Sequence, residues 1–448
     1  RLGREAPGQI DALHRLAAGW FSAQGLIEEA IGHALEAGDY DLAADMLEQE
    51  GFDLISRHKM VSLAHWLEML PAAILAQRPW LNVFMAYTRH WLGEREFALG
   101  ANLDHAEKAL ERSPPPTEAE ARRIRGYIAS LRAQDALSAG DLPQIIEQAN
   151  LALELLPPGD IMGTEAGVSL GGASWRQGDA PAAERAVAAG RDTSRRARKY
   201  LMAVPTATYA GWQQMKQGRL LEALETFEEA LSWATRDHGR LVPIGGFPLL
   251  RISDLRYEWQ DYDAAEAAAR RGRDLSLRLN QADVLVDAHA TLALRLAALE
   301  DVAGAWRLIR RGEEAARSRR PDPFLRTRLD AAKVRLWVDI GQKESALAWL
   351  VSHGPDLDGP LSYHHDLHHL LAVRILLLND RPREAADLAL RVAAAAGKAH
   401  WISEQIQALA LAAEAAAQRG TEQEALNHLR ISLALGAHGR FVRSILDQ

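Results

Sequence analysis

The stretch GWQQMKQGRLLEALETFEEAL, residues 211–231, carries the pattern that decides the fold. A helical run reaches Gly218, where a residue without a side chain can adopt the left-handed backbone that ends a helix. Ala223 belongs to a second amphipathic run, and Gly211 stands seven residues before the bend. Small residues at these two positions allow antiparallel helices to approach closely. The stretch therefore predicts a helix-turn-helix hairpin.

The hairpin pattern recurs along the whole chain. A Gly followed five residues later by an Ala also occurs at Gly25, Gly38, Gly93, Gly178, Gly341 and Gly420, with weaker copies bending at residues 140, 260, 300 and 379. From residue 93 onward the bends are about 40 residues apart. The residues seven positions before these nine bends are Ala86, Ala133, Gly171, Gly211, Ser253, Ala293, Val334, Ala372 and Ala413, and all but Val334 are small. We therefore expect an all-α chain, a right-handed superhelix of tetratricopeptide-like hairpins lengthened to about 40 residues.

The composition agrees with this fold and argues against several classes of protein. Alanine and leucine dominate the 448 residues, and strand-length runs of β-branched or aromatic residues are scarce, which favours helices. A chain without cysteine has neither disulfides nor thiolate metal sites. The net charge of -8 argues against a dedicated nucleic-acid surface, and no run of 18 apolar residues could span a membrane. We expect a cytoplasmic protein that binds neither nucleic acid nor membranes through this segment.

Three longer stretches carry a more specific resemblance. LHRLAAGWFSAQGLIEEAIGHALEAGDYDLAADMLE (13–48), LLRISDLRYEWQDYDAAEAAARRGRDLSLRL (249–279) and AEAAAQRGTEQEALNHLRISLALGAHGRFVRSILD (413–447) resemble the ATP-dependent LuxR-type transcription regulators of the MalT-like family. Trp259 and the final GRFVRSILD go beyond a generic repeat pattern. The resemblance implies a superhelix that senses a small-molecule inducer, between a nucleotide-binding domain with Walker motifs and a helix-turn-helix domain.

Neither flanking domain is expected within this sequence. No G-x-x-x-x-G-K-[ST] motif occurs, and the one Gly-Lys pair, at Gly397, stands in an alanine-rich helical run. The chain opens on Arg1 rather than Met, so we expect a fragment of a longer protein. Residues 1–78 should form a helical lead-in from an upstream module, 79–440 about nine repeats, and 441–448 the start of a linker to a DNA-binding domain. The resemblance implies ATP only for the full-length protein, so we expect this segment to be no enzyme and to hold no cofactor.

The concave face of the superhelix is the expected ligand site. In a tetratricopeptide-like hairpin the first helix lines the groove, and the positions thirteen, ten and six residues before each bend share one face. Around these positions the central and late repeats offer Thr208, Trp212, Phe247, Asp254, Asp287, Arg328, Arg335, Asp366 and His369, and earlier repeats add Trp80, Tyr87, Tyr127, Ser130 and Gln134. Carboxylates, guanidinium groups and aromatic faces together suit a small polar inducer. The alternative is that they are solvated residues or internal ion pairs, such as Asp287 with an Arg of the next repeat.

Other interpretations of the sequence remain open. The groove could instead bind a peptide or a protein, and the segment could contact other domains of the same regulator or a second copy of itself. A hydrolase would rest on GVSLG, residues 167–171, but Ser169 is expected inside a helix rather than on a strand-to-helix turn. A metal enzyme would rest on HHDLHH, residues 364–369, which lacks both the Glu and the third ligand of a zinc protease. We expect these histidines to pack and to hold no metal.

Overall fold

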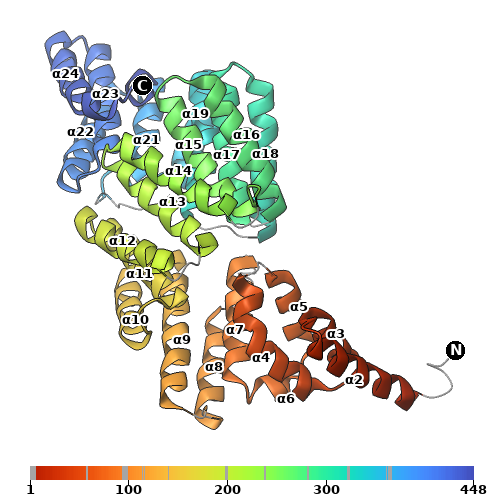
Figure 1. The fold of residues 1–448 in the computed structure, drawn as a ribbon. Coiled ribbons are helices and arrows are strands. Elements are labelled where there is room, and N and C mark those ends of the chain that lie inside the picture. The colour runs from red at the N-terminus through yellow and green to blue at the C-terminus, as the bar shows by residue number, and fades with distance from the viewer. Residues whose placement is uncertain are drawn as a thin grey trace. The chain divides into compact units, whose positions relative to one another are not determined.

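The protein is built of helices and divides into two compact units, residues 1–166 (unit 1) and 167–448 (unit 2), which are described separately (Figure 1). The computed structural model describes residues 7–56, 59–92, 99–113, 115, 117–139, 141–196, 200–236, 239–279, 282–319, 323–359, 361 and 366–447. Within these residues no strand occurs, which confirms the predicted all-α class. The predicted bends at Gly93 and Gly140 lie outside the described residues.

Unit 1 is a series of helices that pack in pairs along the chain. Gly51 packs so closely on the Phe84 ring that a Cβ added there would lie 2.7 Å from the ring carbon Cζ. Its helices are α2 (Pro7–Ala23), α3 (Ile27–Glu36), α4 (Tyr40–Ser56), α5 (Met60–Met69), α6 (Ala72–Leu75), α7 (Pro79–Leu92), α8 (Leu99–Arg112), α9 (Glu118–Ala139) and α10 (Leu142–Leu155), and α11 (Ile161–Arg176) crosses the boundary. The pairs α2 with α3, α7 with α8 and α9 with α10 form hairpins.

Unit 2 continues as a regular solenoid of hairpins. Its helices are α12 (Ala180–Arg196), α13 (Tyr200–Lys216), α14 (Leu220–Arg236), the 3-10 turn η1 (Pro243–Gly245), α15 (Gly246–Glu258), α16 (Tyr262–Leu279), α17 (Ala282–Ala298), α18 (Val302–Arg319), α19 (Pro323–Asp339), α20 (Lys343–His353), α21 (Asp366–Leu378), α22 (Pro382–Lys398), α23 (Ile402–Gln418), α24 (Glu422–Gly439) and α25 (Arg443–Leu446). Each first helix packs on the next, from α13 through α15, α17, α19 and α21 to α23. Figure 1 shows α15 to α19 side by side. The first helices therefore form one continuous wall.

The bends of the hairpins have the predicted left-handed backbone. Gly178, Gly218, Gly341 and Gly420 have φ values of +79°, +80°, +69° and +75°. Gln260 and Glu300 adopt φ of +63° without being glycine, which costs roughly 1–2 kcal/mol per residue. In the repeat predicted to bend at Asn379 the left-handed residue is Asp380, with φ of +58°. That shift by one residue changes which side chains of α21 face the wall.

The small residues before the bends lie where the two helices of each hairpin meet. All nine residues predicted at these positions are buried. A Cβ on Gly171 would lie 2.7 Å from Val187 Cγ2, and one on Gly211 would overlap the ring of Phe227. The close approach of the helices therefore depends on small side chains, as the sequence pattern predicted.

Candidate ligand-binding site

A charged cavity of about 250 Å³ lies on the wall formed by the first helices of unit 2. Its lining includes one residue from each of five successive first helices at the same place in the repeat, six positions before the left-handed residue of the bend: Trp212, Asp254, Leu294, Arg335 and Arg374. The C-terminal segment, residues 441–447, lines the remaining side through Phe441, Arg443, Ser444 and Asp447. The volume is close to the lower end of the range of small-molecule sites, about 300 Å³.

Asp254 of α15 is the centre of the charges in the wall. Its carboxylate oxygens lie 3.0 Å from Arg251 Nη1, 3.0 Å from Arg295 Nη2 and 3.1 Å from Arg328 Nη2. Burial alone would raise the pKa of Asp254, but the charges of Arg251, Arg328 and Arg295 outweigh burial and lower it. The carboxylate therefore stays ionised and holds three helices together through one group.

Asp287 of α17 lies behind this centre and not in the cavity lining. It accepts a 2.6 Å hydrogen bond from Arg251 Nη2, and Arg328 Nε lies 2.6 Å from its other oxygen. The pair of Asp287 with Arg328 is the ion pair with an Arg of the next repeat that the sequence offered as the alternative to ligand binding. Charged pairs of this kind are costly to break once buried, because the remaining partner keeps an uncompensated charge.

Arg295 of α17 has donors that the protein does not use. Its side chain is only 6 % exposed, and its guanidinium carbon lies 3.9 Å from the centroid of the Tyr257 ring. Nη2 donates to Asp254, whereas the buried Nε and Nη1 have no hydrogen-bond partner. A buried donor without a partner costs about 1–3 kcal/mol. Because Arg295 lines the cavity, an acceptor on a bound molecule would satisfy these groups.

The C-terminal segment is anchored to α15 by Glu258. The Glu258 carboxylate accepts hydrogen bonds from the backbone N–H groups of Val442 and Ser444, at 2.8 Å and 3.0 Å, and from the Ser444 hydroxyl at 2.8 Å. Burial raises the pKa of Glu258, against the effect of these hydrogen bonds. Phe441 is buried in an apolar cluster with Phe227, and this contact fixes the segment at its other end.

The carboxylate of Asp447 lies in a group of cationic and hydroxyl donors. Tyr257 donates to it across 2.9 Å, Arg443 forms an ion pair with it, and Arg335 Nη2 lies 3.5 Å away. Arg374 donates to the backbone carbonyl of Asp447 across 2.7 Å. Burial, and after it the charge of Arg335, lowers the pKa of Arg374 to about 9. Burial therefore makes the charged form of Arg374 less favourable than that of a solvated arginine.

The nine sequence-predicted site residues have different positions in the structure. Trp212, Asp254, Arg328 and Arg335 line the cavity together. Thr208 is buried and donates to the Val204 carbonyl of its own helix, and Phe247 packs against the apolar cluster around Trp233. Asp287 lies behind the wall, His369 is buried outside the lining, and the side chain of Asp366 is not among those described.

Several lining residues were missed from the sequence, and one signal would have found part of them. With the bend of α21 at Asp380, the positions six and thirteen before it are Arg374 and Leu367, which both line the cavity. The bend assigned to Asn379 pointed instead to Val373 and Asp366. Arg251, Arg295 and Tyr257 lie at other positions of their helices, and no spacing rule singled them out. Nor did the repeat pattern indicate that the C-terminal segment lines the cavity.

The two enzyme-like motifs are parts of packed helices. Ser169 is buried within α11, where the sequence placed it, rather than on an exposed turn. His364 and His365 lie outside the described residues, while His368 packs edge-on against Trp349 with ring centroids 5.3 Å apart. Among the described residues, no group of three His, Cys, Asp or Glu side chains could hold a metal ion.

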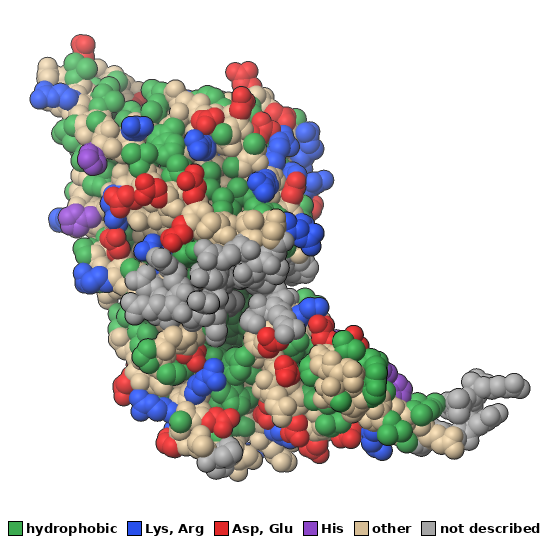
Figure 2. All heavy atoms as spheres, in the orientation of Figure 1, with side chains coloured by type: hydrophobic (Ala, Val, Ile, Leu, Met, Phe, Trp, Pro, Cys, Tyr) green, Lys and Arg blue, Asp and Glu red, His purple; other side chains and the backbone are tan. Residues whose placement is uncertain are grey.

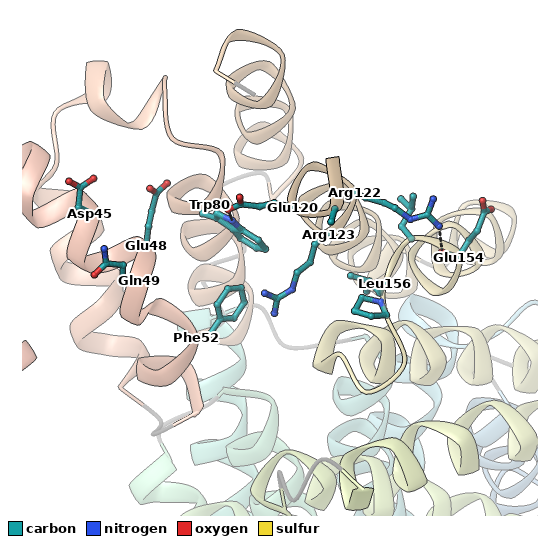
Figure 3. A pocket seen from close by; sticks show the side chains of 13 residues that line it. Asp45, Glu48, Gln49, Phe52, Trp80, Glu120, Arg122, Arg123, Glu154 and Leu156 are labelled. Atoms are coloured by element: carbon teal, nitrogen blue, oxygen red, sulfur yellow. Dashed lines mark hydrogen bonds between the residues drawn. The ribbon is translucent and has the colours of Figure 1, made fainter. Parts of the chain in front are cut away.

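Unit 1 has a larger hollow of about 830 Å³, between α4, α7, α9 and α10 (Figure 3). Phe52 and Trp80 form its floor, and Arg123 reaches in between them from α9, its guanidinium carbon 4.6 Å from the Phe52 ring centroid. Arg123 also pairs with Asp160 at 2.9 Å. Four carboxylates, Asp45, Glu48, Glu120 and Glu154, stand in its lining. Of the earlier candidates only Trp80 lines this hollow, while Tyr87, Tyr127, Ser130 and Gln134 are buried.

The outer surface offers no continuous stripe of one charge on the face shown in Figure 2, where Lys and Arg alternate with Asp and Glu over each unit. No helix within the described residues is both long and apolar enough to cross a membrane.

Known proteins match this chain over most of its length. The family described as "MalT-like TPR region" matches residues 126–448, which is most of the chain. The chain belongs to the MalT-like TPR family. The HTH-type transcriptional regulator MalT of Yersinia enterocolitica is 30% identical over 351 residues, and that of Yersinia pestis is 30% identical over the same length. Each match covers 76% of this chain and 37% of the relative, so the MalT-like chain spans little more than a third of these regulators.

Solved structures similar to this MalT-like chain are more distant. The Rap protein complexed with competence and sporulation factor is 14% identical with a TM-score of 0.46, over 93% of this chain and 98% of that one. The apo form of the quorum sensor NprR from B. thuringiensis is 16% identical with a TM-score of 0.41, over 93% and 99%.

Proposed function

We propose that this segment senses a small polar molecule in the cavity of unit 2 and transmits its presence to other parts of a transcription regulator. Arg295 carries the proposal, because its buried guanidinium lines the cavity and leaves two nitrogen atoms, Nε and Nη1, without a protein acceptor. A ligand acceptor would remove the cost of burying them. Trp212 adds an aromatic face to the same lining, and such faces cover the apolar parts of polar ligands.

The architecture of the wall supports a sensing role. The lining comes from six successive first helices and from the C-terminal segment, so one bound molecule contacts several repeats. A ligand shifts a conformational equilibrium only if it binds one state better than the other. Because each repeat of a solenoid contacts its neighbours, small rotations accumulate along the array. In a cytoplasmic regulator of the MalT type, such a change would reach ATP-dependent oligomerisation and DNA binding in the other domains.

A thermal-shift screen of the 448-residue chain tests this proposal. Sugars, organic acids, phosphates and aromatic compounds are added in turn, and each hit is repeated on Arg295→Gln and Trp212→Ala. Arg270→Gln is the control, because Arg270 is an exposed arginine of α16. We expect one class of compound to raise the melting temperature of the wild type and of Arg270→Gln but not of the two cavity variants. Hits that stabilise all four proteins equally would contradict the assignment.

A second candidate function is supported by the hollow of unit 1. It is larger than the cavity of unit 2, and four carboxylates stand beside an aromatic floor, which suits a basic side chain of a peptide. Two of these carboxylates, Asp45 and Glu48, also pair with Arg78, so a peptide would compete with Arg78 for them. Arg123 already places a guanidinium over this floor. A screen of labelled peptides by fluorescence polarisation tests the idea. Binding that requires lysine or arginine in the peptide and is lost in Trp80→Ala would support it, and binding unchanged in that variant would exclude this hollow.

A further inference from the structure

We propose that the cavity of unit 2 binds a small organic anion whose carboxylate or phosphate replaces the Asp447 carboxylate and releases the C-terminal segment, residues 441–447. The inference rests on the proposed function, since it takes the cavity as the ligand site. It adds the chemical class of the ligand and the part of the chain that responds.

The charges around the cavity favour an anion. Six arginines and Lys216 line it, together with the three carboxylates of Asp254, Glu258 and Asp447. Three more carboxylates, those of Asp287, Asp339 and Glu404, form ion pairs with these cations. A fourth carboxylate outside the lining, that of Glu414, acts on Arg374. The excess of cations is therefore a property of the lining itself, where seven cationic groups stand beside three carboxylates.

Asp447 already shows how an acidic group fits the cavity. Arg335, Arg443 and Tyr257 surround its carboxylate with guanidinium and hydroxyl donors. Guanidinium groups bind carboxylate and phosphate oxygens through short, charge-assisted hydrogen bonds. The same donors would serve a free anion equally well. The carboxylate of Asp447 therefore takes the place that the acidic group of a bound anion would take.

A free anion can make contacts that Asp447 does not make. The Nε and Nη1 groups of Arg295 lie beside the Tyr257 ring without an acceptor. Asp447 accepts its hydrogen bond from the hydroxyl of Tyr257 instead. A ligand with two or more acceptors would bind Arg295 as well as Arg335 and Arg374. It would thereby prefer the state in which Asp447 has left, and this preference is what a release mechanism requires.

The C-terminal segment is held in a way that allows release. Its helix α25 is only four residues long. Its polar anchors are the hydrogen bonds to Glu258, the contacts of Asp447, and the contacts of Arg443 with Tyr257 and Tyr262. The side chains of Arg335 and Arg443 are 21 % and 24 % exposed, so a molecule from solvent can reach them. Loss of the Asp447 contacts would leave the segment held by Glu258, by Arg443 on Tyr257, and by the apolar contacts of Phe441 and Ile445.

Titration calorimetry on the 448-residue chain tests the ligand class. The probes are succinate, citrate, inorganic phosphate and glucose 6-phosphate, with glucose as the neutral control. We expect an anion to bind, Asp447→Asn to bind it about tenfold more tightly if the segment occupies the cavity nine-tenths of the time, and Arg374→Gln to bind it at least tenfold more weakly. Arg270→Gln should match the wild type. The relative strength of the carboxylate and phosphate probes identifies which acidic group the cavity takes.

Hydrogen exchange separates this inference from the proposed function. With the best anion bound, the amides of Val442 and Ser444 should exchange at least tenfold faster, while amides of α15, α17 and α21 exchange more slowly. Binding of glucose or another neutral compound in the cavity, with Val442 and Ser444 still protected, would overturn the inference and leave the proposed function intact. If every compound leaves the cavity helices unchanged, both fail. An anion that binds equally well to wild type and Asp447→Asn would also overturn the inference.

Discussion

The phenol oxygen of Tyr257, on α15, lies 2.9 Å from Asp447 Oδ2 and donates a hydrogen bond to it across a separation of 190 residues. This contact joins the last turn of the chain to the wall of unit 2. Phe441, Arg443 and Ser444 come to the cavity with it, so the lining is complete only while the C-terminal segment is docked. The state of the segment and the state of the cavity are therefore linked.

Removal of the Glu258 carboxylate should loosen this docking. Glu258→Ala deletes the acceptor of three hydrogen bonds, two of them from backbone N–H groups at the start of α25. We expect faster hydrogen exchange at Val442 and Ser444 and a loss of about 2 kcal/mol in the free energy of unfolding. Asp263→Ala, which removes an exposed carboxylate of α16, is the control for the loss of charge. Unchanged protection of residues 441–447 would contradict the anchoring role.

Asp254 should matter more to stability than other carboxylates of unit 2. Asp254→Asn leaves Arg251, Arg295 and Arg328 around a neutral amide, and the loss of one partner from a buried ionic cluster costs about 3–5 kcal/mol. Asp263→Asn, an exposed position on α16, should change stability by less than about 0.5 kcal/mol. Urea unfolding followed by circular dichroism measures both. Equal unfolding midpoints for the two variants would show that the cluster is not the strong link described here.

Gly211 provides a test of the close helix packing that the sequence predicted. In Gly211→Ala the new Cβ would overlap the ring of Phe227 on the partner helix. Overpacking of this kind costs about 1–3 kcal/mol. Gly19→Ala, where nothing lies within 4 Å of the added Cβ, is the matched substitution and should be neutral or slightly stabilising. The double variant Gly211→Ala/Phe227→Leu should recover part of the loss, and a further loss there would contradict the packing explanation.

Much of the fold could be predicted because its cause is local and repeated. Glycine at a bend such as Gly218 and a small residue seven positions before it act within one hairpin, so the sequence shows them directly. Bends without glycine, such as Gln260 and Glu300, were found only because the period continued through them. After α21 the repeat period placed the bend at Asn379, one residue before the left-handed residue Asp380. The residue predicted to face the groove was therefore Val373 instead of Arg374.

The site was only partly predictable, because its chemistry depends on contacts between distant repeats. The spacing rule identified four residues that line the cavity, namely Trp212, Asp254, Arg328 and Arg335. Spacing alone cannot show whether the donors of a side chain are all satisfied by its neighbours. Arg295 has two buried nitrogen atoms without a hydrogen-bond partner, and only the structure shows this. The docking of Asp447 joins residues almost 200 positions apart, and no periodic pattern encodes such a contact.

Stability should depend on pH through Glu165 at the start of α11. Burial raises the pKa of this carboxyl from 4.5 to about 7, so the folded state keeps the proton between these values while the unfolded state releases it. The stabilisation is complete below pH 4.5 and is lost as the pH rises through 7. Glu165→Gln should remove this part of the pH dependence. The variant should therefore gain in urea midpoint over the wild type more at pH 8 than at pH 5. Glu147→Gln, on the exposed face of α10, should leave the profile as in the wild type.

The most direct test of the central claim is a map of hydrogen exchange for the 448-residue chain with and without a compound that raises its melting temperature. We expect protection to increase in the helices that line the cavity of unit 2, namely α15, α17, α19 and α21, and the increase to be lost in Arg295→Gln. Protection confined to the residues around Phe52 and Trp80 in unit 1, or spread evenly along all first helices, would contradict it.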